Sequence, residues 1–269
     1  MTSTGPSSLT VGIWQDSGIL GNIASNLAII SRETACASRR GVDLLIFPEC
    51  FLTGYFNKNE VNLIARKIDQ DTISALQITA KSNATAILVG YYEAMGVNTY
   101  NSAILIGSNG EILANYRKRA LFGDWERSVF VPGSEPVLTV YQGIRIAILI
   151  CFDVEFPELA RECARNGADL IAVPTSNMEP YVHINRCLVP TRAIENQVYI
   201  AYANRIGSEN HLRFVGESVI HDPEGTELAR ASYERPELIL ANISRSTLHA
   251  ARSEYSYLDE VSKIYRSNN

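Results

Sequence analysis

The sequence predicts an α/β fold in which mixed β-sheets lie inside and helices cover them. Short apolar runs rich in β-branched residues alternate with amphipathic stretches along the chain. Some neighbouring runs are joined by short turns, whereas others flank a helical stretch, so hairpins and strand–helix–strand units are mixed. Two sheets packed face to face, each covered by helices, would satisfy this pattern. A three-layer sandwich would satisfy it equally well.

The first half of the chain combines hairpin strands with two helices. The helices are expected at residues 21–40 and 71–81, and Asp71 is the predicted N-cap of the second. Ser108, Asn109 and Gly110 form a turn-prone run that favours a hairpin. Strands are expected at residues 9–14, 44–47, 86–91, 101–106 and 112–116.

The second half repeats this mixture of elements. Helices are expected at residues 157–166, ended by Gly167, and at residues 185–196. No repeat, low-complexity segment or dividing linker interrupts the chain, so we expect one domain over residues 1–269, frayed at about 1–8 and 267–269. Strands are expected at residues 137–141, 144–150, 170–173, 198–204, 215–221, 228–231 and 238–243.

Composition narrows the classes of function. Of the 269 residues, 46% are hydrophobic, which is enough for a sizeable core, and the net charge is only −5. Basic residues are scattered, so no nucleic-acid partner is expected. No run approaches the roughly 20 apolar residues that span a bilayer, so no membrane partner is expected. The first residues lack the basic start and apolar stretch of a secretory signal.

The cysteine and histidine patterns argue against disulfides and metal sites. Five cysteines are an odd number, and none forms a C-x-x-C pair. The four histidines lack metal-ligand spacing, so each is expected to be a surface or packing residue. Together these patterns predict a cytoplasmic protein without a metal site. The histidines are His183, His211, His221 and His249.

Three predicted strands end in side chains that could carry chemistry. Glu49 follows the strand at 44–47, Lys118 follows the strand at 112–116, and Cys151 follows the strand at 144–150. Taken singly, each has an ordinary interpretation: a solvated loop acid, a solvated basic edge and a small core hydrophobe. Taken together, they suggest nucleophilic acyl chemistry. A thiol needs a base to become a thiolate, and a tetrahedral oxyanion needs a nearby positive charge.

The residues around these three positions resemble the nitrilase superfamily of carbon–nitrogen hydrolases. The resemblance runs in order from about residue 9 to about residue 245. Its blocks are FPECFLTGY (47–55), YRKRALFGDWERSVFVPG (116–133), LICFDVEFPE (149–158), VPTSN (173–177), RAIENQVYIAYANRIG (192–207) and FVGESVIHDPEG (214–225).

The resemblance implies a four-layer αββα sandwich and a Glu-Lys-Cys triad. Glu49 matches the acid of the triad, Lys118 its lysine and Cys151 its nucleophile, while Glu126 matches a second glutamate often found nearby. One departure is visible at Ala120, where many members carry a histidine. We expect this departure to change local hydrogen bonding and pocket shape but not the triad.

The resemblance also suggests a reaction. Thiolate attack on a small amide would give a thioester acyl-enzyme, and water activated by Glu49 with the help of Glu126 would then release a carboxylic acid. This reaction would need no metal or organic cofactor. The run Cys151-Phe152-Asp153 differs from the C-W-E of true nitrilases, and residues 154–157 replace the paired arginines of one group of N-carbamoyl hydrolases. The whole is similar to bacterial small-amide amidases, including stereoselective ones. A nitrilase, an N-carbamoyl amine hydrolase and a catalytically inactive binding protein remain as alternatives.

Pocket and partner predictions complete the interpretation. The amide substrate is expected to contact residues in the loops beside the triad, although core packing would explain the aromatic ones equally well. Cys36, Cys50, Cys163 and Cys187 are taken as structural, with labelling possible at Cys50 because it adjoins Glu49. Family members pair through helices, so a homodimer or larger homo-oligomer is expected, with residues 244–266 as a partner-contacting tail. The predicted substrate-binding residues are Tyr55, Trp125, Phe152, Asn177 and Tyr181.

Overall fold

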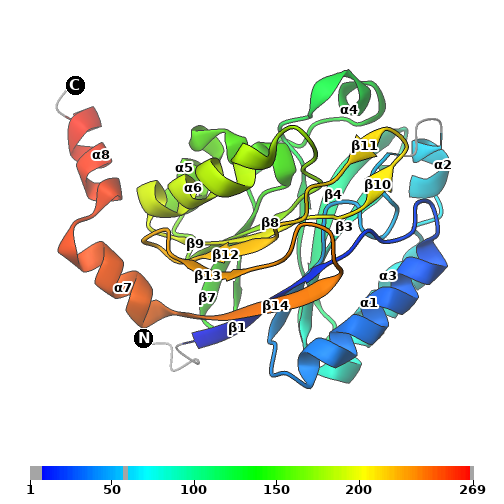
Figure 1. Ribbon diagram of the computed structural model, residues 1–269, viewed down its shortest axis with the longest axis horizontal. Coiled ribbons are helices and arrows are strands. Elements are labelled where there is room, and N and C mark those ends of the chain that lie inside the picture. Colours follow the sequence, from blue (N-terminus) through cyan, green and yellow to red (C-terminus); the bar gives the residue numbers. More distant parts are fainter. Residues whose placement is uncertain (1–7, 57–59, 267–269) are drawn as a thin grey trace.

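The computed structural model describes residues 8–56 and 60–266, and these form an αββα sandwich (Figure 1). Two six-stranded mixed sheets pack face to face, and helices lie on the outer face of each. The four-layer alternative left open by the hydrophobic pattern is therefore the correct one. The predicted frayed segments 1–7 and 267–269 lie outside the described residues. Ser8 was wrongly included among them, because it pairs with Ser244 in the first strand.

The first sheet places a short central strand between parallel neighbours. Strand β2 runs parallel to β1 and β3, whereas the remaining pairs are antiparallel. Its central position explains why its three residues are fully buried. In order across the sheet, the strands are β14 (Glu237–Ser244), β1 (Ser8–Gln15), β2 (Leu44–Ile46), β3 (Ala86–Met95), β4 (Asn98–Ile106) and β5 (Ile112–Arg117).

The second sheet has a parallel centre as well. Strands β7, β8 and β9 run parallel, and antiparallel strands flank them. A short hairpin of β10 (Ser208–Glu209) and β11 (Leu212–Arg213) lies outside both sheets. In order, the strands are β13 (Glu227–Arg230), β12 (Val219–His221), β9 (Tyr199–Ala203), β8 (Leu170–Pro174), β7 (Ile144–Ile148) and β6 (Leu138–Tyr141).

The helices cover the sheets and leave a tail at one end (Figure 1). Helices α1 and α3 lie on the outer face of the first sheet, and α5 and α6 on that of the second. Helix α8 begins against the body, where the Tyr257 N–H donates to Gln197 Oε1 at 3.1 Å and Leu258 packs on the core, and its C-terminal end projects from one end of the sandwich. The helices are α1 (Ile23–Ser38), α2 (Val61–Ala65), α3 (Gln70–Asn83), α4 (Gly123–Val129), α5 (Pro157–Arg165), α6 (Val189–Asn196), α7 (Arg245–Glu254) and α8 (Tyr257–Arg266), with a 3₁₀ turn η1 (Cys151–Glu155) and a π turn η2 (Ile184–Leu188).

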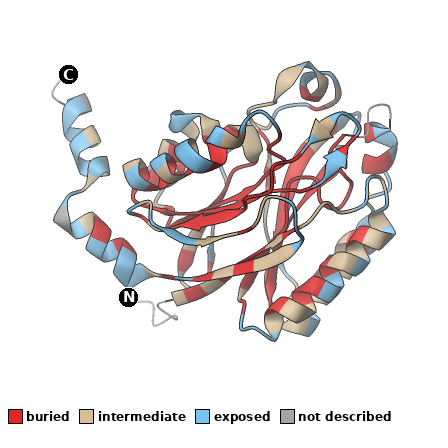
Figure 2. Ribbon diagram, in the orientation of Figure 1, coloured by how far each residue is buried: buried red, intermediate tan, exposed pale blue. Residues whose placement is uncertain are grey.

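Side-chain alternation in the strands builds two apolar layers. In β2, Leu44 and Ile46 face the second sheet and join the large cluster between the sheets. Leu45 points the other way, into the cluster that includes Ile30 of α1 and Leu76 of α3. Successive strand residues point to opposite faces, so one short apolar strand serves both layers. Figure 2 shows the resulting buried band along the sheets and the inner helix faces.

Two details of the predicted elements were wrong. The N-cap of α3 is Asp69 rather than Asp71, because Asp69 has extended backbone and its Oδ1 accepts from the Thr72 N–H at 2.9 Å. The predicted strand at 215–221 pairs regularly only at Val219–His221. Its first residues instead bind the loops near the site, since the Val215 N–H donates to the Asn177 carbonyl at 3.1 Å.

The described residues contain no helix that is both long enough and apolar enough to cross a membrane.

Candidate active site

Three side chains from two distant segments of the sequence meet in the interior of the protein. The Lys118 Nζ lies 2.8 Å from Glu49 Oε1 and 2.8 Å from Glu126 Oε1. All three side chains are fully buried. Buried charges are retained only where they are paired and hydrogen-bonded, and Lys118 bridges both carboxylates. The predicted acid, lysine and second glutamate are therefore in direct contact.

Glu49 lies in the turn that follows β2, with one oxygen bound and one oxygen free. Its Oε1 accepts from Lys118 and from Asn101 Nδ2, the latter at 2.7 Å. Its Oε2 is buried and has no hydrogen-bond partner among the described residues. An unpaired buried carboxylate oxygen is costly, so its presence at a strand end suggests a proton-accepting role.

A glycine in β3 allows the Glu49 turn to sit where it does. A Cβ added at Gly90 would lie 2.3 Å from the Cys50 nitrogen and 2.7 Å from the Glu49 Cα. Both are backbone atoms, which cannot rotate away as a side chain can. The Leu52 N–H also donates to the Gly90 carbonyl at 3.1 Å, so the turn rests directly on the strand.

We expect Gly90→Ala to displace Glu49 and lower both activity and stability. Overpacking of this kind typically costs about 1–3 kcal/mol of the free energy of unfolding. Denaturant unfolding together with the rate of amide hydrolysis would measure the two effects. Gly107→Ala is the matched control, since a Cβ there meets only side-chain atoms, at 3.2 Å or more. Equal behaviour of the two variants would contradict this interpretation of Gly90.

Glu126, on the short helix α4, is held by a second set of contacts. Its Oε1 accepts from the Tyr55 hydroxyl at 2.7 Å, and its Oε2 accepts from the Phe122 N–H at 2.7 Å. Burial raises the pKa of Glu126, and the charge of Glu49 adds to this, although Lys118 opposes both. Burial would lower the pKa of Lys118, but the two carboxylates outweigh it and hold that pKa well above its ordinary value. Lys118 is therefore a permanent positive charge.

Cys151 occupies the first position of η1, directly beyond the end of β7. Its φ of +47° is in the left-handed region, which is unusual for a residue other than glycine and often marks a functional site. The residue is partly exposed and lines a small cavity, although its thiol is buried. Burial raises the pKa of Cys151, the charge of Glu49 raises it further, and Lys118 opposes this. The resting side chain is thus a neutral thiol that needs a base before it can attack.

Asp153 ties the cysteine turn to the lysine segment. Its Oδ2 accepts from the Ile150 N–H at 3.0 Å and from the Tyr116 hydroxyl at 2.8 Å. Its Oδ1 accepts from the Ala120 N–H at 2.7 Å. At Ala120, where the sequence departs from the family pattern, the connection to the cysteine turn is made by the main chain.

The predicted substrate-binding residues divide between two neighbouring cavities. Phe152, Asn177 and Tyr181 line the Cys151 cavity. Tyr55 and Trp125 instead line an adjacent aromatic cavity of about 180 Å³, and Phe122 and Met178 line both. The amide of Asn177 is already engaged, because its Nδ2 donates to Tyr181 O at 2.9 Å and its Oδ1 accepts from the Met178 N–H at 3.0 Å.

Several residues that hold the site were not singled out from the sequence. Arg205 is fully buried, pairs with Glu209 at 2.6 Å and donates to the Glu49 carbonyl at 3.2 Å. Glu209 in turn accepts from the N–H groups of Tyr55 and Phe56. Arg205 lies within a motif block, but nothing in its sequence neighbours indicates the turn at 49–56 as its partner. Asn101 lies outside the motif blocks, and its sequence neighbours do not indicate Glu49 as its partner either.

The other cysteines and histidines are separate from this chemistry. All five cysteines are free, and Cys50 is buried with its Sγ 3.4 Å from Asn101 Oδ1. His211 packs edge-on against Phe56, with ring centroids 5.2 Å apart. No three His, Cys, Asp or Glu side chains of the described residues are grouped as a metal site would require.

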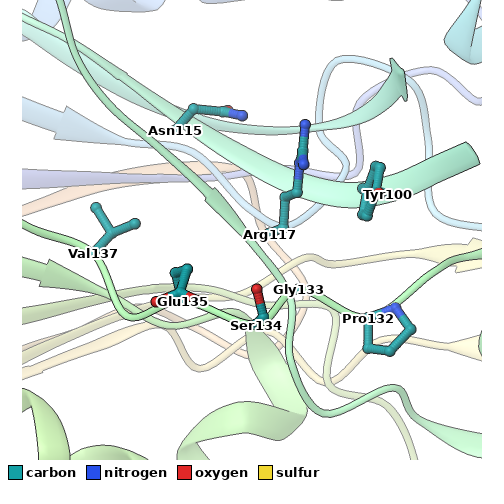
Figure 3. Close-up of a pocket in the computed structure, with 8 residues that line it drawn as sticks. All are labelled: Tyr100, Asn115, Arg117, Pro132, Gly133, Ser134, Glu135 and Val137. Carbon is teal, nitrogen blue, oxygen red and sulfur yellow. The ribbon is translucent and has the colours of Figure 1, made fainter. Parts of the chain in front are cut away.

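A further hollow lies beside β5 (Figure 3). It is lined by Tyr100, Asn115, Arg117 and residues 132–137, and it contains none of the residues described above. Arg117 stacks over the Tyr100 ring at 4.0 Å and pairs with Glu93 at 2.5 Å. The positive charge of Arg117 is therefore already paired with Glu93. We place the candidate active site at Cys151 and not in this hollow.

Comparison with known proteins agrees with this geometry. The chain is 32% identical to an (R)-stereoselective amidase from Pseudomonas sp., over 94% of this chain and 91% of that protein. It is 38% identical to a nitrilase from Pyrococcus abyssi, over 77% of this chain and 79% of that protein. An amidase from Nesterenkonia sp. AN1, solved with the acetamide moiety of fluoroacetamide on its active-site cysteine, superposes with a TM-score of 0.87, 30% identity and 99% coverage of both chains.

The carbon-nitrogen hydrolase family model matches residues 10–253. With this match, the shared αββα sandwich and relatives named as amidases, the chain belongs to the carbon–nitrogen hydrolase family of the nitrilase superfamily and is a hydrolase of C–N bonds other than peptide bonds.

Proposed function

We propose that the protein is an amidase that converts a small amide to a carboxylic acid and ammonia through a thioester on Cys151. The observation that carries the proposal is the buried cluster of Lys118 between Glu49 and Glu126, with the cysteine turn tied to the same strand end through Asp153. Relatives named as amidases and the modified active-site cysteine of the Nesterenkonia amidase support it.

In the first half-reaction, the free Oε2 of Glu49 accepts the Cys151 proton as the sulfur attacks the amide carbon. The raised pKa of the thiol makes this transfer necessary. The ammonium of Lys118 and the Phe152 N–H stabilise the oxyanion. No described residue accepts a hydrogen bond from that N–H, so it is available. Glu49 then returns the proton to the leaving nitrogen, ammonia departs, and a thioester remains.

In the second half-reaction, water replaces the sulfur. Glu49 removes a proton from the water, the hydroxide adds to the thioester carbon, and the proton returns to the Cys151 thiolate as the carboxylic acid leaves. Glu126 shares Lys118 with Glu49 and fixes the ammonium, so it positions the oxyanion contact rather than exchanging the proton itself. Neither half-reaction needs a metal or an organic cofactor.

Matched substrates test the proposed reaction. The protein should release ammonia from small primary amides such as propanamide faster than from the corresponding nitriles. Acid-quenched samples should show the acyl mass on Cys151 by mass spectrometry. A faster nitrile reaction would favour the nitrilase alternative, which is also suggested by the similarity to the Pyrococcus abyssi protein named as a nitrilase. Carbon dioxide release from N-carbamoyl amines would favour the other hydrolase, and a lack of turnover on every class would favour an inactive binding protein.

We also propose a homodimer that uses the C-terminal tail. Helix α7 is anchored to the body, because Gln197 Nε2 donates to the Ala251 carbonyl at 2.6 Å. Helix α8 begins against the body and exposes Ile264 by 59% toward its end, which suits contact with a second copy. Sedimentation should give a dimer or larger assembly, and deletion of residues 256–269 should weaken it. The five free cysteines suit a reducing cytoplasm, where we place the protein.

A further inference from the structure

The cavity beside Cys151 has an aromatic wall. Phe122 lies between Phe152 and Tyr181, with ring centroids 5.3 Å and 5.8 Å away and both pairs edge-on. All three rings line the cavity that the thiol lines. Aromatic faces carry partial negative charge and attract cations, most strongly where water is excluded. Such a wall accepts an alkyl chain and an ammonium equally well by shape.

A carboxylate stands in the same cavity. Glu155, the last residue of η1, lines it together with Cys151 and the three rings. Its carboxylate makes no hydrogen bond and no ion pair with any described residue, unlike the carboxylates of Glu49, Glu126 and Asp153. A half-buried carboxylate without a direct partner lacks both full hydration and a hydrogen bond, so it favours a cation that arrives with the ligand.

The cations nearest to Glu155 are committed elsewhere. Lys118 is shared between Glu49 and Glu126. Arg192 pairs with Glu195 at 2.9 Å. Its remaining N–H groups donate to the main-chain carbonyls of Val154 and of Glu155 itself. Both cations act on the Glu155 carboxylate only from a distance, and neither forms an ion pair with it. A carboxylate in this position attracts a positively charged substrate and disfavours an anionic one.

We propose that Glu155 is a specificity-determining residue, and that it selects amides carrying a protonated amine, with the ammonium held between its carboxylate and the ring of Phe122, Phe152 or Tyr181. This inference rests on the proposed amide hydrolysis and names its substrate class. The reaction at Cys151 is unchanged. The ammonium takes no part in bond making, and it fixes the amide carbon against the sulfur by anchoring the far end of the substrate.

Pairs of substrates with the same shape, one charged and one neutral, measure the effect of the ammonium charge alone. Each ω-amino amide from glycinamide to 5-aminopentanamide is compared with the neutral amide in which methyl replaces the ammonium, from propanamide to hexanamide. For at least one chain length, kcat/KM should favour the ammonium by about tenfold or more, as a charge-assisted hydrogen bond predicts. Glu155→Gln should bring this ratio close to one. The Glu155 carbonyl that binds Arg192 is main chain and remains in place.

Glu158→Gln is the matched control, because it removes the same charge from an exposed glutamate on α5. It should leave the ratio as in the wild type. Neutral amides hydrolysed without any preference for an ammonium would overturn the role of Glu155 and leave the proposed function intact. An unchanged ratio in Glu155→Gln would overturn it too.

If no amide is hydrolysed, that result counts against the proposed function and does not test Glu155. A binding measurement then tests the role of Glu155 separately. The same substrate pairs are then titrated calorimetrically into Cys151→Ala, with and without Glu155→Gln. Tighter binding of the ammonium partner that disappears with Glu155→Gln would support the inference on its own. Equal dissociation constants for the two partners would overturn it.

Discussion

Replacing Cys151 with alanine is expected to abolish amide hydrolysis and the acyl adduct together. Loss of a covalent nucleophile typically costs about 10⁴-fold or more in kcat, because the reaction must then proceed by direct attack of water. Alanine keeps the Cβ and the left-handed backbone of this position, so the fold should survive. Product formation and intact-protein mass spectrometry measure the two losses, and thermal unfolding checks the fold.

Cys187→Ala is the matched control for the thiol, because Cys187 is exposed and lies outside the site. It should retain full activity and the acyl adduct. Glu49→Gln should resemble Cys151→Ala in activity, since the raised pKa of the thiol leaves almost no thiolate without a base. Substantial turnover by Cys151→Ala would remove the proposed mechanism altogether.

Replacing Lys118 with methionine is expected to damage both catalysis and folding. Loss of the ammonium removes one oxyanion contact, which is typically worth about 10²–10³-fold in kcat. It also leaves two buried carboxylates without a cation, and breaking a buried pair in this way typically costs about 3–5 kcal/mol. Denaturant unfolding and hydrolysis rates at matched pH measure the two effects. Lys81→Met, at an exposed position of α3, removes the same charge and should change neither.

The stability loss in Lys118→Met should depend on pH in a defined direction. The pKa of Glu126 is already raised by burial, and without Lys118 it should rise further above its value in the unfolded chain. A folded-state pKa that is raised favours folding below the unfolded pKa, and that benefit disappears as the pH rises through the folded pKa. The variant should therefore be closest to wild type near pH 4–5 and weakest at pH 8. A loss that is equal at all pH values would contradict the buried carboxylate pair.

Local sequence was sufficient to place the candidate triad at strand ends. Apolar runs stop directly before Glu49 and Cys151, and a central strand of this kind delivers the next side chain to an edge of its sheet. The motif blocks then predicted the αββα sandwich, which the structure has. Details that depend on competing local signals were less accurate, as the N-cap at Asp69 and the shortened β12 illustrate.

The supporting contacts could not be predicted in this way. Arg205 binds the carbonyl of Glu49 across 156 positions of sequence, and Asn101 binds its carboxylate across 52. Such contacts are set by the packing of one sheet on the other and by the close approach at Gly90, neither of which leaves a periodic signal. The division of the predicted pocket residues between two cavities has the same origin.

The sequence by itself determined which chemical groups are present and which of them stand at strand ends, because periodicity and turn chemistry act over a few residues. Only the tertiary structure decided how each group is buried and paired, and so how its pKa is shifted. The burial of Cys151, the pairing of Lys118 with two carboxylates and the unpaired carboxylate of Glu155 depend on which atoms surround each group. Charge energies vary with solvent exclusion and with distances of a few ångströms, and folding brings those atoms together from segments far apart in the chain.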